Sequence, residues 1–381
     1  MTRRIHLLTG TRAEYDLLQP VAAALRAHSV DVKLIPAAAH HGDALAQIAA
    51  DGIPVAPAIV SLLRGDSWEA RGLSFAMLCE GLTRQFAAER PDVLVVAGDR
   101  EEALAGAIAG NFHGVVVAHL FGGDRCLASD VDEVFRPAIS KLSHLHFTAT
   151  EGHRARLIRM GEEPAVVFAV GATGLDRLVA EPALPDDAIE RAVGIDPARP
   201  YFLLLHHPSP LLGEDTGARE VEQIVSGLAA LGHPILCGRP NTDPGSALLS
   251  AALERARVRH PELRLVPNLP RTLFANLYRR CTAIVGNSSS IVIESSVLRV
   301  TGILVGRRQE LRETGANVLS VPADALAVRE AATRALSDPA WRAALAGCGS
   351  PYGDGRSGAR VAAVLSRVEL APGLRMKTLS Y

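Results

Sequence analysis

The stretch DVLVVAGDREEALAGAIAGNFHGVVVAHLFGG, residues 92–123, decides the fold class of this 381-residue chain. It contains two continuous apolar runs, which are separated by a polar turn and an alanine-rich, helix-forming segment. Continuous apolar strands that alternate with helices are typical of a parallel sheet covered by helices on both faces. The stretch therefore predicts a strand, a helix and a second strand of an α/β domain.

The same alternation recurs along the chain. Apolar runs such as IHLLTG, VDVKLIPAA and HLHFTAT form a first series, and YFLLLHHP, HPILCGRPN and CTAIVGNSSS belong to a second. Two series of similar size predict two Rossmann-like, doubly wound domains, joined within residues 178–192, where prolines and acids interrupt the pattern. We expect an N-terminal domain over residues 1–178, a C-terminal domain over 179–357, and a helix and tail over 358–381 that can pack back on the N-terminal domain.

Composition argues against several classes of function. With 40 basic and 41 acidic residues the net charge is -1, which leaves no overall field to attract nucleic acid or an anionic membrane. No apolar run reaches the roughly 18 residues of a membrane span, and the apolar part of the N-terminus is too short for a secretory signal. The five cysteines show no metal-binding or disulfide spacing. These features predict a cytoplasmic protein that binds neither nucleic acid nor membrane.

Polar residues follow the predicted strands of the first half. Ligands of open α/β sheets bind beyond the carboxyl ends of the strands, so these residues are candidates for a site. In TGTRAEYDLLQP, Gly10 permits a tight turn and Arg12 offers a positive fork to a phosphate or carboxylate; the alternative is a surface Arg12 paired to Glu14. Asp99 and Arg100 follow DVLVVAG, where they either serve a ligand or cap the next helix.

The second half repeats this arrangement. His206 and His207 follow YFLLL, where a histidine held by the next proline can bind a phosphate or transfer a proton, although a lone histidine is more often structural. In NSSSIVIES, serines 288–290 open an apolar helix and offer hydroxyls and N–H groups to an anion, while Glu294 is near enough to reach a sugar hydroxyl. Ordinary helix capping explains the serines equally well. Their joint placement favours a nucleotide or nucleotide sugar in a cleft between the domains.

Taken together, these stretches resemble the UDP-N-acetylglucosamine 2-epimerase family, and within it the UDP-hydrolysing branch. The matching pieces span almost the whole chain in the family's order: TGTRAEYDLLQPV, GDREEAL, HLFGG, DEVFRPAISKLSHLHF, HHP, PNTDPGS, GNSSSIVIES, GRRQELRETGANVLSV and PYGDG. Arg-Ala-Glu-Tyr after Gly-Thr looks like the hydrolysing branch, because non-hydrolysing relatives usually have Gly-Thr-Arg-Pro-Glu there. The resemblance implies a GT-B architecture, with two Rossmann-like doubly wound domains and a ligand cleft between them.

The resemblance also implies which residues hold a UDP-linked amino sugar. UDP would lie mainly on the C-terminal domain, with the LVPNLP loop near uracil, and the sugar would lie on the N-terminal domain. The implied substrate-binding residues are Arg12, Arg100, Asp124, Asn241, Ser288, Ser289, Ser290, Glu294 and Arg308. The implied catalytic residues are Asp99, Asp132, Glu133, Arg136 and His207.

The family's chemistry suits this set. Loss of UDP with removal of the C2 proton gives a glycal, to which water then adds with inverted configuration at C2. Such a reaction needs a carboxylate base near C2 and cationic groups on the departing diphosphate. Asp99, Asp132 and Glu133 are the acid–base candidates, whereas Arg136 would position them and His207 would assist the leaving group. No metal or redox cofactor is expected.

The segment HLFGGDRCLASDVDEVFRP departs from the family pattern. Phe121 occupies a position where the family commonly has Glu or His, Asp124 stands where Glu is usual, and Pro137 replaces a His. Phenylalanine cannot transfer a proton, so a step performed by that residue must move to another group or be absent. The contrast with the intact UDP half favours a changed sugar or a changed reaction, with neutral drift as the alternative.

The leading hypothesis is a cytoplasmic, homodimeric enzyme that cleaves the anomeric C–O bond of a UDP-N-acetylhexosamine and epimerises C2, releasing a ManNAc-like sugar. One alternative is a GT-B glycosyltransferase, in which Phe121 would exclude water or contact an acceptor, or else a UDP-sugar hydrolase without epimerisation. A further alternative is a non-catalytic protein that binds a UDP-sugar. Three carboxylates beside the cleft argue against it, because buried carboxylates are costly.

Overall fold

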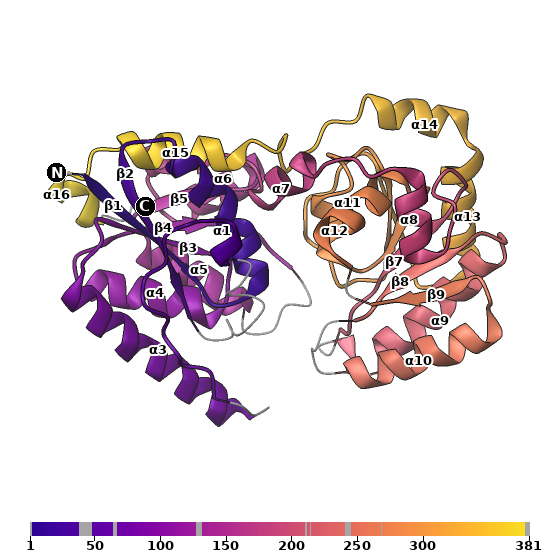
Figure 1. The fold of residues 1–381 in the computed structure, drawn as a ribbon, viewed down its shortest axis with the longest axis horizontal. Coiled ribbons are helices and arrows are strands. Elements are labelled where there is room, and N and C mark those ends of the chain that lie inside the picture. Colours follow the sequence, from indigo (N-terminus) through magenta and orange to yellow (C-terminus); the bar gives the residue numbers. More distant parts are fainter. Residues whose placement is uncertain are drawn as a thin grey trace. The chain divides into compact units, whose positions relative to one another are not determined.

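The computed structural model describes residues 2–37, 48–63, 67–126, 132–209, 212–213, 215–240, 245–267 and 269–377, with Asp132 described by its backbone alone. Contacts divide the chain into two compact units, each built on one six-stranded sheet (Figure 1). Unit 1 comprises Met1–Asp124, Val131–Arg177 and Gly353–Tyr381, and unit 2 comprises Arg125–Asp130 and Leu178–Tyr352. No helix in the described ranges is long and apolar enough to cross a membrane.

Unit 1 contains a fully parallel sheet. Its strands are β1 (Arg3–Thr9), β2 (Val30–Pro36), β3 (Val93–Ala97), β4 (Val116–Leu120), β5 (Leu145–Thr148) and β6 (Val167–Ala169). The strand order is β2-β1-β3-β4-β5-β6. The chain leaves β1 toward one edge and returns to its other side at β3, so β1 and β3 border the topological switch point, where open α/β sheets bind ligands.

Helices cover both faces of this sheet. The helices of unit 1 are α1 (Arg12–Leu25), α3 (Trp68–Ala88), α4 (Glu101–Phe112), α5 (Asp132–Leu142), α6 (Glu151–Arg159), α15 (Ser357–Arg367) and α16 (Pro372–Arg375), with a 3-10 turn at Pro164–Val166. Helix α7 (Gly174–Ala180) crosses the boundary between the two units. The end of the chain packs beside its beginning, because α15 contacts α1 and a Cβ on Gly358 would lie 2.7 Å from the Pro20 carbonyl (Figure 1).

Strand β3 explains why the apolar runs are continuous. Val93 and Val95 belong to the core cluster beneath α1 and α15, whereas Leu94 and Val96 belong to the cluster beneath α3 and α4. Successive side chains of a strand point to opposite faces, and here both faces are dry. An alternating polar pattern would therefore leave polar groups buried in one of the two cores.

Unit 2 repeats the architecture. Its strands are β7 (Phe202–Leu205), β8 (Ile235–Gly238), β9 (Leu263–Val266), β10 (Ala283–Gly286), β11 (Thr301–Val305) and β12 (Val318–Val321). Its helices are α8 (Asp186–Val193), α9 (Thr216–Ala229), α10 (Ser246–Arg259), α11 (Arg271–Arg280), α12 (Ser289–Ile293), α13 (Ala325–Ser337) and α14 (Pro339–Ala346). The all-parallel order β12-β11-β10-β7-β8-β9 is that of a Rossmann fold, with the switch point between β7 and β10. The predicted fold class, two doubly wound α/β domains, is confirmed.

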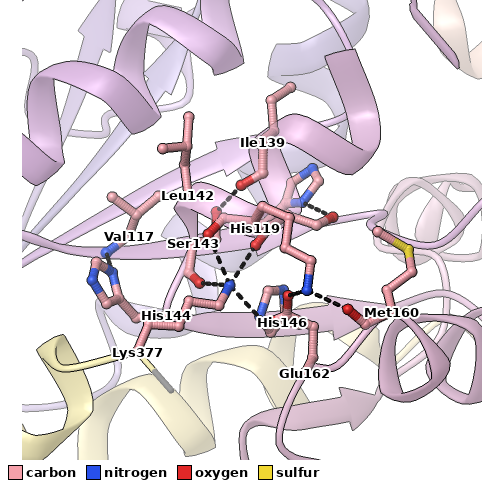
Figure 2. A network of polar contacts seen from close by, with 12 residues as sticks. Val117, His119, Ile139, Leu142, Ser143, His144, His146, Met160, Glu162 and Lys377 are labelled. Atoms are coloured by element: carbon pink, nitrogen blue, oxygen red, sulfur yellow. Dashed lines mark hydrogen bonds and ion pairs between the residues drawn. The ribbon is translucent and has the colours of Figure 1, made fainter. Parts of the chain in front are cut away.

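A buried histidine gives unit 1 a measurable acid sensitivity. His144 Nδ1 accepts a hydrogen bond from the Val117 N–H at 3.0 Å (Figure 2). Burial, with the charge of Lys377 as a second cause, lowers the pKa of His144 to about 4. The unfolded chain binds this proton near pH 6.5 and the folded protein does not, so stability is lost as the pH falls below that value. The loss is about 2 kcal/mol between pH 7 and pH 5.

The expected result is that the free energy of unfolding of the His144→Asn variant depends less on pH than that of the wild type, by this amount. Asparagine can still accept the Val117 hydrogen bond but does not titrate. Urea unfolding at pH 7 and pH 5 measures the difference. Other groups also change the stability with pH: burial and Glu102 raise the pKa of Glu14 to about 8, so Glu14 stabilises the fold as the pH falls. The effect of His144 is therefore read as the difference between the wild type and the variant. Equal pH dependence of both proteins would contradict the prediction.

Candidate active site

The turn after β1 is closed by Glu14. Thr11 caps α1 by accepting a hydrogen bond from the Glu14 N–H at 3.3 Å, and Glu14 Oε2 accepts from the N–H groups of Gly10 at 2.7 Å and Thr11 at 3.0 Å. This reciprocal pattern is a capping box. The Glu14 carboxylate therefore points into the turn, which is not the pairing with Arg12 that was the alternative. Arg12 is exposed at the first position of α1.

A second carboxylate, that of Glu102, lies against the same turn. A Cβ on Gly10 would lie 2.3 Å from Glu102 Cγ, so only glycine fits beside this side chain. Burial raises the pKa of Glu102, opposed by Arg100, whose Nε lies 3.2 Å from Glu102 Oε2. The Arg100 guanidinium is thus held at the switch point by the helix that follows β3.

Arg136 joins two carboxylates at the ends of β3 and α5. Its side chain is 3% exposed and donates to the Asp99 carboxylate and, at 2.7 Å, to Glu133 Oε1. Burial opposes the charge of Arg136, but Asp99 and Asp124 outweigh burial and raise its pKa above the ordinary value. The Asp99 and Glu133 side chains keep 25% and 31% of their surface exposed, so each can meet a substrate. Asp99 does not cap α4, whose N-cap residue Arg100 makes no side-chain cap hydrogen bond.

The glycine pair after β4 makes a tightly packed floor. Phe121 has φ 69°, a left-handed conformation that is rare for a bulky residue and costs about 1–2 kcal/mol. Its ring packs against the core, and its N–H donates to the Phe147 carbonyl at 2.9 Å. Gly123 has φ 81°, and a Cβ there would lie 2.4 Å from the His153 carbonyl. Asp124 Oδ1 lies 3.3 Å from His153 Nε2, so Asp124 is anchored beside this floor.

In unit 2 a buried asparagine holds the histidine that follows β7. Asn287 Oδ1 accepts from the His207 N–H at 2.8 Å, and Asn287 Nδ2 donates to the His207 carbonyl at 2.9 Å. Arg308 Nη1 donates to the Asn287 carbonyl at 3.3 Å. Burial and then the charge of Arg308 lower the pKa of His207 to about 4, so the ring is neutral at neutral pH. It can offer one N–H to a phosphate while Arg308 supplies positive charge.

The serine segment opens α12 beside this histidine. Ser288 is the N-cap residue and accepts from the Ser290 N–H at 3.3 Å. The Ser290 hydroxyl donates to Glu294 Oε2 at 2.6 Å. Ser289 and Ser290 are half-buried at the first positions of the helix. The sequence therefore brings His207, Arg308 and the serines to the β7–β10 switch point.

Gly286, which ends β10, makes this placement possible. Its φ is 130°, and a Cβ would lie 2.1 Å from the Leu205 carbonyl oxygen. The expected result is that Gly286→Ala costs about 3 kcal/mol of unfolding free energy, because crowding and backbone strain act together. Urea unfolding measures this cost. Gly232→Ala is the matched control, because Gly232 also has a positive φ of 70° but a Cβ built there would have no neighbouring atom within 4 Å. An equal loss of unfolding free energy in both variants would contradict the role of crowding.

Two residues among those predicted lie wholly or partly outside the description. Asn241 is outside the described residues, and of Asp132 only the backbone position, at the start of α5, is described. In unit 1 the structure gathers one set of predicted residues: Asp99, Arg100, Asp124, Glu133 and Arg136, with Arg12 at the neighbouring turn. In unit 2 it gathers another: His207, Ser288, Ser289, Ser290, Glu294 and Arg308.

The prediction from the sequence missed Asn287 and Glu102. Asn287 follows a strand-ending glycine, as Asp99 follows Gly98, and this repeated pattern of strand, glycine and Asp or Asn was a signal that could have identified it. Glu102 lies in the first turn of α4, where acids are common for reasons of helix capping alone. No sequence signal separates such an acid from one that holds an arginine at a site.

Comparison with known proteins shows to which family this chain belongs. A sequence profile of the UDP-N-acetylglucosamine 2-epimerase family matches residues 23–366. A relative from Legionella pneumophila, named UDP-N,N'-diacetylbacillosamine 2-epimerase (hydrolyzing), is 34% identical over 100% of this chain and 100% of its own. The chain belongs to the UDP-N-acetylglucosamine 2-epimerase family. The resemblance stated from the sequence motifs is thus confirmed.

Solved structures of the UDP-N-acetylglucosamine 2-epimerase family share this fold. One from Listeria monocytogenes matches with a TM-score of 0.79 at 17% identity and covers 96% of each chain. The Neisseria meningitidis structure, determined with bound UDP-GlcNAc, matches with a TM-score of 0.78 at 18% identity and covers 95% of this chain and 99% of that one. The predicted GT-B fold with two Rossmann-like domains is therefore confirmed.

Proposed function

We propose that this chain is a hydrolysing 2-epimerase that converts a UDP-N-acetylhexosamine into UDP and the free 2-epimer of the sugar. Its membership of the UDP-N-acetylglucosamine 2-epimerase family and its full-length similarity to a hydrolysing member support this function. The observation that carries the chemistry is the pair of half-exposed carboxylates, Asp99 and Glu133, bridged by the buried Arg136.

The reaction needs a base, a leaving group and water. A carboxylate removes the C2 proton as the bond between C1 and the UDP oxygen breaks, which leaves a C1–C2 double bond in a glycal. Water then adds its hydroxyl to C1, and a proton returns to C2 on the opposite face. Asp99, Glu133 and Asp132 are the acid–base candidates, and Arg136 orients the first two.

The departing UDP carries negative charge that a protein can stabilise. We assign this task to the cluster of unit 2, where the neutral His207 ring offers an N–H and Arg308 offers a full positive charge. The serines at the start of α12 add hydroxyl and backbone donors, and Glu294 is assigned to the ribose. Arg12, exposed at the first position of α1, is assigned to the diphosphate.

The sugar itself is proposed to be a UDP-linked diacetamido sugar. The Legionella relative is named for UDP-N,N'-diacetylbacillosamine, a sugar whose C6 is a methyl group without a hydroxyl and whose C4 carries a second acetamido group in place of a hydroxyl. Phe121 gives the floor after β4 an apolar ring where an ionisable residue is common in the family. A less polar sugar suits such a floor better than N-acetylglucosamine does.

A homodimer in the cytoplasm completes the proposal. One helix of unit 1 offers a surface for a second copy, because Leu73 and Met77, one turn apart on α3, are 50% and 41% exposed. Large exposed apolar side chains grouped on one helix are typical of protein contacts. Sedimentation of the wild type and of a Leu73→Glu variant tests this contact, and a monomeric wild type would contradict the homodimer.

The decisive experiment follows the reaction by NMR in deuterated water with UDP-N-acetylglucosamine and UDP-N,N'-diacetylbacillosamine. The expected result is UDP release, deuterium at C2 and a free sugar of inverted C2 configuration, with the diacetamido substrate preferred. Release of UDP without deuterium at C2 would establish a UDP-sugar hydrolase that does not epimerise its substrate. UDP binding without turnover of either substrate would overturn the enzymatic function.

A further inference from the structure

A fully buried histidine lies between the two segments that carry the carboxylates. His119, on β4, is 0% exposed. Its Nε2 lies 2.7 Å from the Gly98 carbonyl, and its Nδ1 lies 3.0 Å from the Ser140 hydroxyl on α5. Gly98 directly precedes Asp99, and Ser140 follows Arg136 by one helical turn.

The partners of His119 fix its protonation. A carbonyl oxygen can only accept, so Nε2 carries the hydrogen and donates it to Gly98. Nδ1 then has a lone pair and accepts from the Ser140 hydroxyl. Burial lowers the pKa of His119 to about 3, so the ring keeps this neutral form at neutral pH. A ring that donates with one nitrogen and accepts with the other links two segments without exchanging a proton.

The glycine pair after β4 leaves room for this link. A Cβ on Gly122 would lie 2.9 Å from Ser140 Oγ and 3.1 Å from His119 Nδ1. Any larger residue would therefore push apart the two atoms that form the hydrogen bond. The Ser140 Oγ also lies 3.1 Å from the Arg136 carbonyl oxygen, so its single hydrogen is shared between His119 Nδ1 and the turn of α5 that carries the arginine.

The end of α5 that contains Ser140 is also held by Lys377. Lys377 Nζ donates to the carbonyls of Ser140 at 2.9 Å, Lys141 at 3.0 Å and Ser143 at 2.7 Å, and lies 2.6 Å from a Glu162 carboxylate oxygen (Figure 2). A positive charge at this position also suits the negative end of the helix dipole. His119 and Lys377 therefore hold the C-terminal part of α5 together, one helical turn from Arg136.

We propose that His119 and Ser140 are positioning residues, which hold the Gly98–Asp99 turn and α5 at the spacing that lets Arg136 bridge Asp99 and Glu133. The catalytic part of this inference rests on the proposed function, whereas the structural part does not. Misplacing a reacting group by about 1 Å costs on the order of 100-fold in rate. We therefore expect loss of the link to lower kcat with little change in UDP affinity, because the UDP cluster is assigned to unit 2.

Three variants test the two hydrogen bonds of His119 separately. His119→Asn places an oxygen where Nδ1 was and loses the donor to Gly98, His119→Gln keeps that donor and loses the acceptor for Ser140, and Ser140→Ala removes the hydroxyl alone. His144→Asn is the matched control, because it changes another buried histidine of the same unit that contacts neither Asp99 nor Arg136. The expected kcat falls about 10- to 100-fold in the three variants and less than about twofold in the control, with KM and the UDP dissociation constant within about threefold.

Hydrogen exchange of the full-length protein supplies the second measurement, read by mass spectrometry on peptides covering residues 98–104 and 132–139. We expect faster exchange in both peptides of the Ser140→Ala variant. This variant is the mildest change, so it decides the test if the histidine variants do not fold. Wild-type exchange and wild-type kcat in Ser140→Ala would overturn the inference. Altered exchange with a wild type that turns over no UDP-sugar would retain the structural link and reject the proposed function.

Discussion

Asp99→Asn is expected to lower kcat about 10²- to 10⁴-fold while the UDP affinity stays within about twofold. Asparagine keeps the shape of the side chain and one acceptor for Arg136, but it cannot take up the C2 proton. Removing the proton acceptor therefore acts on the chemical step and spares the binding of the nucleotide. UDP release measures the rate, and deuterium incorporation at C2 reports the proton transfer itself.

Glu101→Gln is the control for this change. Glu101 lies two residues from Asp99, and its carboxylate makes two hydrogen bonds of 2.9 Å to Arg71, so the variant removes the same charge from the same turn without touching Arg136. Its kcat should stay within about fivefold of the wild type. A fully active Asp99→Asn enzyme would reject Asp99 as the base and leave Glu133 or Asp132.

Arg136→Met is expected to have two effects, on activity and on stability. Without the buried guanidinium, the Asp99 and Glu133 carboxylates lose their shared counter-charge, so the free energy of unfolding should fall by about 3 kcal/mol. The same repulsion moves both carboxylates out of position, so kcat should fall at least about 100-fold. Urea unfolding and the UDP-release assay measure the two changes.

Arg136→Lys separates charge from geometry. Lysine retains the positive charge but has one compact ammonium group in place of a planar fork, so it cannot bridge two carboxylates as arginine does. Most of the stability should return, whereas kcat should stay well below the wild-type value. Wild-type stability in Arg136→Met would contradict the view that this arginine neutralises the carboxylate pair.

Much of the candidate site was predictable because strand ends are visible in the sequence. The apolar runs ending at Gly98 and Gly286 place Asp99 and the serine segment at the carboxyl edges of two parallel sheets, and the structure has them at the switch points. Periodicity determines this much, since every parallel strand of a sheet ends at the same edge. The prediction needed no knowledge of which side chains touch.

The rest depends on contacts between distant residues. Asn287 holds His207 in place because it forms hydrogen bonds with both backbone groups of that residue, which lies 80 residues earlier in the chain. Composition cannot predict a contact between residues so far apart in the sequence. The sequence offered Arg12 as the partner of Glu14, whereas in the structure Glu14 accepts hydrogen bonds from the backbone N–H groups of the turn. The positive φ of Phe121 was equally invisible, because a phenylalanine gives no local signal for a left-handed conformation.

The return of the chain's end to unit 1 has a consequence for biosynthesis. Helix α1 packs against α15, which begins at Ser357, so the ribosome must translate more than 300 further residues before α1 meets this neighbour. At about 5–20 residues per second this delay lasts on the order of 15 to 70 s. During that time the nascent N-terminal half exposes the apolar face of α1, which makes it a natural client for chaperones, whereas the second Rossmann unit is free to fold as soon as it leaves the exit tunnel.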